Sequence, residues 1–128
     1  QFSLDIRSEE DPLRDAALAE ILQKINDIAV LRNVELKIEQ THSAPAVHCD
    51  SALQNTLLKG VTEAGIVPKV LASGAGHDAM AMAEICPVAM LFTRCKGGIS
   101  HHPAESITTD DVAASLAVMH HSLRTLKY

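Results

Sequence analysis

A loop rich in glycine and histidine, residues 96–105, carries the side chains best suited to metal chemistry. Its sequence is Lys-Gly-Gly-Ile-Ser-His-His-Pro-Ala-Glu, and it follows an apolar run that ends at Phe92. A histidine on a short loop after two glycines can present a neutral imidazole nitrogen to a metal ion, so His101 is the candidate ligand, and Glu105 or a nearby carbonyl could orient its other ring nitrogen. The simpler alternative is a pair of solvated surface histidines, His101 and His102.

A second loop, residues 73–78, has the sequence Ser-Gly-Ala-Gly-His-Asp and precedes a possible helix. Together with Ala79 it satisfies the G-x-G-x-x-A pattern of dinucleotide-binding turns. Against that hypothesis, Asp78 would lie where a pyrophosphate needs a helix N-terminus free of negative side chains, and no acidic residue ends the following predicted strand. A tight turn whose glycines permit positive φ is the simpler alternative.

The N-terminal segment contains one group suited to binding an anion, the guanidinium of Arg7. A guanidinium can donate two parallel charged hydrogen bonds to a carboxylate, which makes Arg7 a candidate for binding an acidic ligand. Asp5 lies on the same face of the predicted strand, so a surface ion pair between these two side chains is the alternative. The residues alone leave both interpretations open.

The elements around Arg7 are predicted from the spacing of apolar residues. Residues 2–7 alternate apolar and polar side chains, which predicts a strand with one buried face. A long helix is predicted over residues 12–32, with Asp11 as its N-cap and a proline in its first turn. Strict alternation over residues 34–39 predicts a second strand. One strand, one helix and one strand form a β-α-β unit.

The two glycine-containing loops are predicted to lie in an α/β layer arrangement. Residues 41–50 lack periodicity and contain Pro45, so they mark the best candidate for a domain boundary or crossover. Beyond them, helices and short strands alternate, which is typical of α/β domains. The predicted elements are a helix over 51–64 ended by Gly65, strands over 67–72 and 88–92, and a last helix with a capping-box-like start formed by Thr108 and Asp111. The fold class predicted for the chain is α/β.

Composition excludes several classes of partner. The formal net charge is -5, the 11 lysines and arginines are dispersed, and aromatic residues make up only 2%, so no nucleic acid partner is expected. No apolar run approaches the roughly 20 residues needed to span a bilayer, so no membrane partner is expected. The three cysteines form no CxxC pair, which fits a reducing cytosol. The start at Gln1, without an initiator methionine, is typical of a fragment or processed product.

Three motifs together carry a family resemblance. Residues 73–80 read SGAGHDAM, residues 87–92 read PVAMLF, and residues 96–105 read KGGISHHPAE. In this order they resemble the closing motifs of the allantoate, N-carbamoyl-L-amino acid and ureidoglycolate amidohydrolases and β-ureidopropionases, a group within the dinuclear-metal carboxypeptidases and aminoacylases. The triplet Asp5-Ile6-Arg7 resembles one in the lid domain of that group. The resemblance covers essentially the whole chain.

The resemblance implies a site built around two divalent ions, zinc or manganese, in the intact enzyme. His101 resembles the last ligand of that site, Arg7 the lid arginine that binds the substrate carboxylate, and Gly74 a backbone position lining the substrate pocket. His77 matches the same motif and is kept as a substrate-binding candidate. The other ligands and the general base have no counterpart here. No catalytic residue is therefore assigned to this chain, and the fragment alone is expected to be inactive and to bind no metal tightly.

The resemblance also implies a division of the chain and a function for the intact protein. Residues 1–40 are expected to be the C-terminal part of a lid and dimerisation domain, and residues 41–128 the C-terminal part of an incomplete α/β catalytic domain. The intact protein is expected to be a cytoplasmic homodimer that hydrolyses a C–N bond of allantoate, ureidoglycolate or an N-carbamoyl amino acid. The alternatives are a metallo-aminoacylase or peptidase of the wider family, and a non-catalytic binding or dimerisation module with the same fold.

Overall fold

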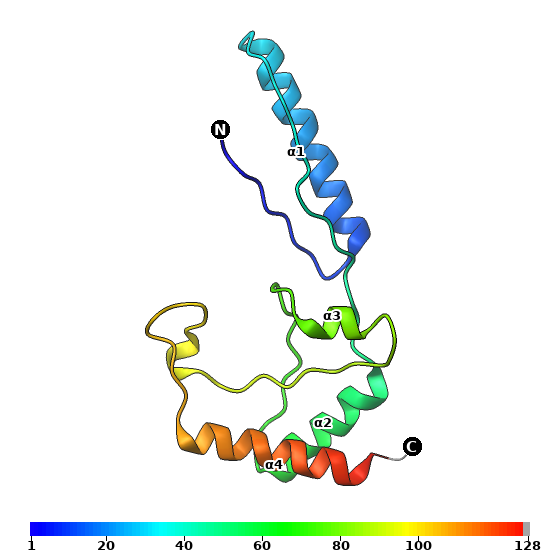
Figure 1. The fold of residues 1–128 in the computed structure, drawn as a ribbon, viewed down its shortest axis with the longest axis vertical. Helices are drawn as coiled ribbons and strands as arrows, with labels where there is room; N and C mark the ends of the chain where they lie inside the picture. Colours follow the sequence, from blue (N-terminus) through cyan, green and yellow to red (C-terminus); the bar gives the residue numbers. More distant parts are fainter. Residues whose placement is uncertain (127–128) are drawn as a thin grey trace. The chain divides into compact units, whose positions relative to one another are not determined.

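The computed structural model describes residues 1–126 and contains helices but no β-strand within that range (Figure 1). The last two residues of the predicted second domain, 41–128, lie outside the described residues. The helical elements are α1 (Asp11–Leu31), α2 (Ser51–Glu63), α3 (Asp78–Met82), the 3-10 turn η1 (Lys96–Gly98) and α4 (Thr109–Thr125). No helix in the described part is both long and apolar enough to cross a membrane.

The predicted α/β class is therefore wrong, both for the β-α-β unit and for the incomplete α/β domain after it. A strand requires backbone N–H and C=O groups paired with a neighbouring strand, and alternation of side chains supplies no such neighbour. Residues 2–7 and 34–39 keep the alternation but run as irregular chain, with Phe2 76% exposed. Residues 67–72 and 88–92 are likewise irregular.

The long helix agrees with its prediction to within one residue at each end, but its cap does not. The N-cap is Glu10, which makes no side-chain capping bond, and Asp11 is the first helical residue. Pro12 lies in the first turn, where its missing N–H costs nothing. The last helical residue is Leu31, and the C-cap residue Arg32 donates its N–H to the Ile28 carbonyl.

The termini of α2 and α4 agree with the sequence prediction. Gly65, with φ of 73°, ends the turn after α2 in the left-handed conformation that glycine adopts readily. Thr108 caps α4: its hydroxyl accepts from the Asp111 N–H at 3.1 Å and donates to the Asp111 carboxylate at 2.6 Å. This pair confirms the predicted capping-box-like start, although the Asp111 carboxylate accepts here from the Thr108 hydroxyl.

The chain divides into two compact units. The first contains residues 1–48 together with 72–76, and the second contains residues 49–71 and the chain from His77 onward. In the first unit, the segment after α1 turns back and runs along the helix (Figure 1), held at one end by the bond from Val34 N–H to the Ala29 carbonyl.

The second unit is organised by the packing of α2 on α4. A Cβ built on Gly60 would lie 3.0 Å from the Val118 carbonyl oxygen and 3.2 Å from the Ser122 hydroxyl, so glycine permits the close approach of these helices. Val118 and Ser122 are buried there, whereas Ala29 is the buried residue of the first unit within residues 1–126. Many large apolar side chains therefore stay exposed in both units.

Candidate functional site

The Arg7 guanidinium is held at three points in the first unit. Its Nε and Nη2 donate to the two carboxylate oxygens of Asp5, at 2.9 and 2.6 Å, and its Nη1 donates to the Gly74 carbonyl oxygen at 2.6 Å. The Arg7 and Asp5 side chains are both more than half exposed. The hydrogen bond from Arg7 lowers the pKa of the Asp5 carboxyl, so the pair is ionised at neutral pH.

Gly74 contributes its backbone oxygen to this cluster. The loop around it is a local turn in which the Ser73 hydroxyl accepts from the Ala75 N–H at 3.2 Å. Gly74 does not have positive φ, and a Cβ built on it would meet nothing within 4 Å. The alternative in which Gly74 is needed for positive φ is therefore wrong. Two of the predicted substrate-binding positions, Arg7 and Gly74, are hydrogen-bonded to each other across 67 positions of sequence.

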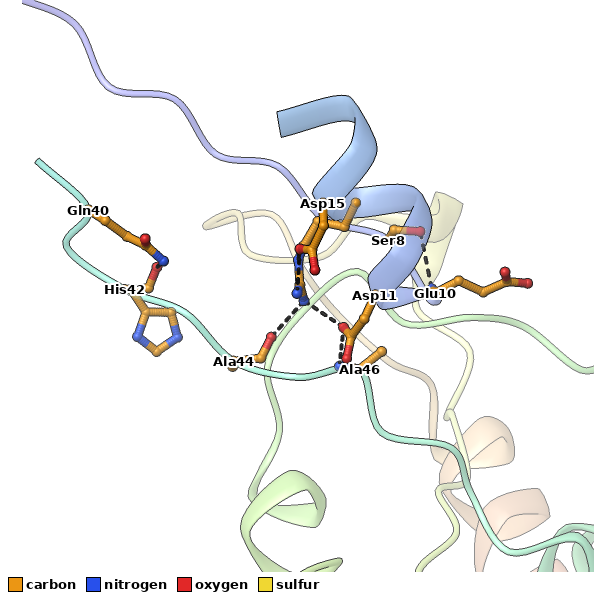
Figure 2. Close-up of polar contacts among 9 residues, drawn as sticks. Ser8, Glu10, Asp11, Asp15, Gln40, His42, Ala44 and Ala46 are labelled. Carbon is orange, nitrogen blue, oxygen red and sulfur yellow. Dashed lines mark hydrogen bonds and ion pairs between the residues drawn. The ribbon is translucent and has the colours of Figure 1, made fainter. Parts of the chain in front are cut away.

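The first turn of α1 holds the returning segment of the first unit (Figure 2). The Asp11 carboxylate accepts from the Ala46 N–H at 2.8 Å and from Arg14 Nη1 at 2.6 Å. The same Nη1 atom also donates to the Ala44 carbonyl at 2.9 Å. Asp11 was predicted as a helix cap, but its carboxylate instead satisfies a backbone N–H of a distant segment. This network positions residues 44–46 against the helix, and no pattern in the sequence indicates it.

The loop that carries His101 in the second unit is closed by its own hydrogen bonds. The Glu105 carboxylate accepts from the His101 backbone N–H at 2.8 Å, and the Glu105 N–H donates to the His102 carbonyl at 2.8 Å. His101 has φ of 56°, a left-handed conformation that is uncommon for non-glycine residues and is found at functional sites. Glu105 thus contacts His101 as expected, but through the backbone and not through the imidazole ring.

Cys95 lies at the other side of the same carboxylate. Its Sγ is 3.7 Å from Glu105 Oε1, so one glutamate bridges positions 95 and 101. Desolvation, and then the charge of Glu105, raise the pKa of the Cys95 thiol. Cys95 is consequently a protonated thiol at neutral pH, suited to donating a weak hydrogen bond and not to acting as a nucleophile. The base of the loop is closed by the Lys96 N–H bonding to the Ser106 carbonyl at 2.8 Å.

An ion pair connects this loop to α4. Arg94 donates from Nε and Nη2 to one oxygen of Asp111, at 2.9 and 2.7 Å. The pKa of Asp111 is lowered by its hydrogen bond with Thr108 and then by that with Arg94. The capping carboxylate of α4 therefore also positions the chain that enters the His101 loop.

His77 is the N-cap residue of α3, and its ring lies edge-on to Phe92 with centroids 6.3 Å apart. The dinucleotide hypothesis fails here because no strand precedes this turn and α3 is only five residues long, with Asp78 in its first turn. A phosphate would meet that carboxylate without the helix dipole that normally binds it.

The second unit also contains an apolar groove with a volume of about 540 Å³. It is formed by α2, α4 and the segment 89–93, with side chains that include Leu53, Leu57, Leu91, Leu116 and Leu123. None of the candidate substrate or metal positions lines it.

A metal ion needs several donor side chains close together. Within residues 1–126 no three His, Cys, Asp or Glu side chains are arranged to hold a metal ion. An imidazole such as that of His101 suits zinc or manganese, but a single imidazole cannot hold an ion tightly. An ion bound at His101 would therefore need further ligands besides this imidazole.

Comparison with known proteins identifies the relatives of this chain. Residues 5–125 match the family described as Peptidase family M20/M25/M40. The chain is 42% identical to a probable allantoate deiminase of Oryza sativa subsp. japonica and 44% identical to an allantoate deiminase of Arabidopsis thaliana, covering 92% of this chain and 26% and 24% of those proteins. It is 38% identical to an N-carbamoyl-L-amino-acid amidohydrolase of Pseudomonas sp. (strain NS671), covering 96% of this chain and 30% of that protein.

The chain thus spans roughly a quarter to a third of the length of these relatives. The family match, by contrast, includes nearly every described residue, from the Asp5–Arg7 pair through the His101 loop to the end of α4. This chain therefore belongs to peptidase family M20/M25/M40.

Proposed function

We propose that the full-length protein carrying this chain is a metal-dependent amidohydrolase that cleaves a C–N bond of a ureido or N-carbamoyl acid. The relatives named as allantoate deiminases and N-carbamoyl-L-amino-acid amidohydrolases support this substrate class. Both kinds of substrate carry a carboxylate close to a carbamoyl nitrogen. The single structural observation that carries the proposal is an arginine, Arg7, whose guanidinium is fixed at three points and still has N–H groups left to donate.

In this proposal the full-length protein would bind two divalent ions, zinc or manganese, which would supply Lewis-acid chemistry and lower the pKa of water at the site. His101 supplies one imidazole nitrogen to them. Arg7 holds the substrate carboxylate, the Gly74 carbonyl helps to fix Arg7, and His77 lies on the same loop as Gly74. The general base and the other ligands belong to parts of the protein outside this chain.

The test uses the full-length protein, with turnover of allantoate and N-carbamoyl amino acids and metal content measured on the same preparations. His101→Ala is expected to lose bound metal and to lower turnover by at least a hundredfold. The matched control is His102→Asn, because the Asn side chain can still accept the hydrogen bond that His102 Nδ1 receives from the Ala104 N–H. Unchanged metal content and turnover in His101→Ala would refute the assignment.

We also propose that residues 1–40 belong to a lid and dimerisation domain, residues 41–128 to the catalytic domain, and that the protein forms a homodimer through α1. The support is the exposed apolar end of this helix, where Val30 and Leu31 are 82% and 84% exposed. Leu31→Asp is expected to give monomers of the full-length protein in light scattering. Val67→Asp, at an equally exposed position of the second unit, is the control and should leave the dimer intact.

We propose a cytoplasmic location for the protein, because its three cysteines are free, which fits a reducing compartment.

A further inference from the structure

The hydrogen bonds of Arg7 can be counted against its capacity. A guanidinium has five N–H groups: one on Nε and two on each of Nη1 and Nη2. Asp5 takes the Nε–H and one N–H of Nη2, and the Gly74 carbonyl takes one N–H of Nη1. One N–H therefore remains on each Nη nitrogen. Two N–H groups on adjacent nitrogens can bind both oxygens of a second carboxylate.

The way in which Asp5 binds Arg7 decides which part of the guanidinium is available. Asp5 occupies the Nε and Nη2 side with both of its oxygens, which sets the plane of the guanidinium. The Gly74 carbonyl holds Nη1 from a segment that lies 67 residues further along the chain. An exposed arginine without such contacts samples many rotamers, and ordering it costs entropy at the moment a ligand binds. Three fixed bonds remove that cost in advance.

Stability does not explain this arrangement. Both side chains of the pair are more than half exposed, and ion pairs of this kind contribute little to folding because water screens them. Among residues 1–126, Asp5 forms no ion pair with any arginine or lysine other than Arg7. The hydrogen bonds therefore orient Arg7 more than they hold the unit together.

We propose that Asp5 is a positioning residue, which holds the Arg7 guanidinium so that its two remaining N–H groups bind the carboxylate of the substrate. The inference rests on the proposed function for the identity of the ligand. It adds that Asp5 acts through Arg7 without touching the ligand, and that the part of Gly74 that matters is its carbonyl oxygen. The alternative is that Asp5 competes with the ligand for Arg7. In that case Asp5 would weaken ligand binding, and removing its carboxylate would strengthen it.

The test measures binding separately from turnover. Isothermal titration of metal-free full-length protein with an N-carbamoyl-L-amino acid, and with the corresponding amide that lacks the carboxylate, gives two dissociation constants. Asp5→Asn is expected to raise the constant for the acid about tenfold, the change that corresponds to one charge-assisted hydrogen bond, and to leave that for the amide unchanged. Asp5→Glu keeps two acceptor oxygens and is expected to recover most of the affinity. Arg7→Lys should lose the preference for the acid.

Asp15→Asn is the matched control, because Asp15 is a similarly exposed carboxylate paired with another arginine, Arg14. It should leave both constants unchanged. Tighter binding of the acid by Asp5→Asn, equal effects on acid and amide, or no binding of the acid by the unaltered protein would each overturn the positioning role. In metal-loaded protein, Asp5→Asn should raise KM and change kcat by less than about twofold. Absence of turnover with intact acid binding would refute the proposed amidohydrolase function and leave the role of Asp5 standing.

Discussion

The two candidate regions are built in different ways. In the first unit, Arg7 is fixed by an exposed side-chain pair and by a carbonyl 67 residues away, with no helix or strand beneath it. In the second unit, His101 lies in a loop whose bonds join residues within 95–106, and Arg94 connects that loop to the capped end of α4. The first arrangement depends on distant parts of the chain meeting, whereas the second is specified locally and supported by packed helices.

The largest effect is expected from a change that breaks the helix packing of the second unit. Gly60→Val places side-chain atoms against the Val118 carbonyl, where even a Cβ would lie at 3.0 Å. Because the obstacle is backbone, we expect a loss of about 2–3 kcal/mol in the free energy of unfolding, measured by urea denaturation of the full-length protein. A loss below about 0.5 kcal/mol would mean that α2 and α4 are not packed as closely as described.

The next effect concerns the carboxylate that closes the His101 loop. Glu105→Ala removes the acceptor of the His101 N–H, so exchange of that amide hydrogen should become faster. If His101 is a metal ligand, the affinity for metal should also fall by about 10- to 100-fold, because the backbone that positions the ring is released.

Glu105→Gln is the control for that variant, since its amide oxygen can still accept the same bond. It should retain slow exchange and most of the metal affinity. Equal exchange rates in the alanine and glutamine variants would show that the loop is held without this carboxylate.

A smaller effect is expected from pH at the start of α4. The pKa of Asp111 in the folded protein lies below its usual value of 3.8, so the ionised form is favoured by folding. Its contribution to stability is therefore complete above about pH 4 and is lost as the pH falls through the lowered pKa. In urea unfolding series between pH 6 and 2.5, Asp111→Asn should lose stability at pH 6 and show a shallower decline. A decline as steep as that of the unaltered protein would contradict this role.

The smallest effect is expected from a substitution of Gly74 in the first unit, because Gly74, unlike Gly60, has no close neighbour. Gly74→Ala adds a methyl group where nothing lies within 4 Å and where φ is not positive, and it leaves the carbonyl bonded by Arg7 in place. We expect a change of less than about 0.5 kcal/mol in unfolding free energy. A large loss of unfolding free energy would show that the loop 73–75 requires glycine for a reason other than its φ angle or the space around it.

Helices were predicted well because their signals are local. The proline in the first turn of α1, Gly65 after α2, and Thr108 with Asp111 at α4 each act within a few residues, so the sequence contains the whole interaction. The strands were predicted wrongly because residues 2–7 and 34–39 show which side chains share a face but not what pairs with their backbone. The Asp11 network was missed for the same reason, since Ala44 lies 30 residues after Arg14 and Ala46 lies 35 residues after Asp11 along the chain.

By itself the sequence determined the helices α1, α2 and α4, the capping residue of α4, the motifs that resemble the amidohydrolase group, and the candidates Arg7, Gly74, His77 and His101. Only the tertiary structure decided that Arg7 is bonded to both Asp5 and the Gly74 carbonyl, and that Glu105 holds the backbone of His101 and not its ring. The physical reason is that capping and helix formation involve neighbours along the chain, whereas the orientation of a guanidinium or an imidazole depends on which distant acceptors folding brings within hydrogen-bonding distance.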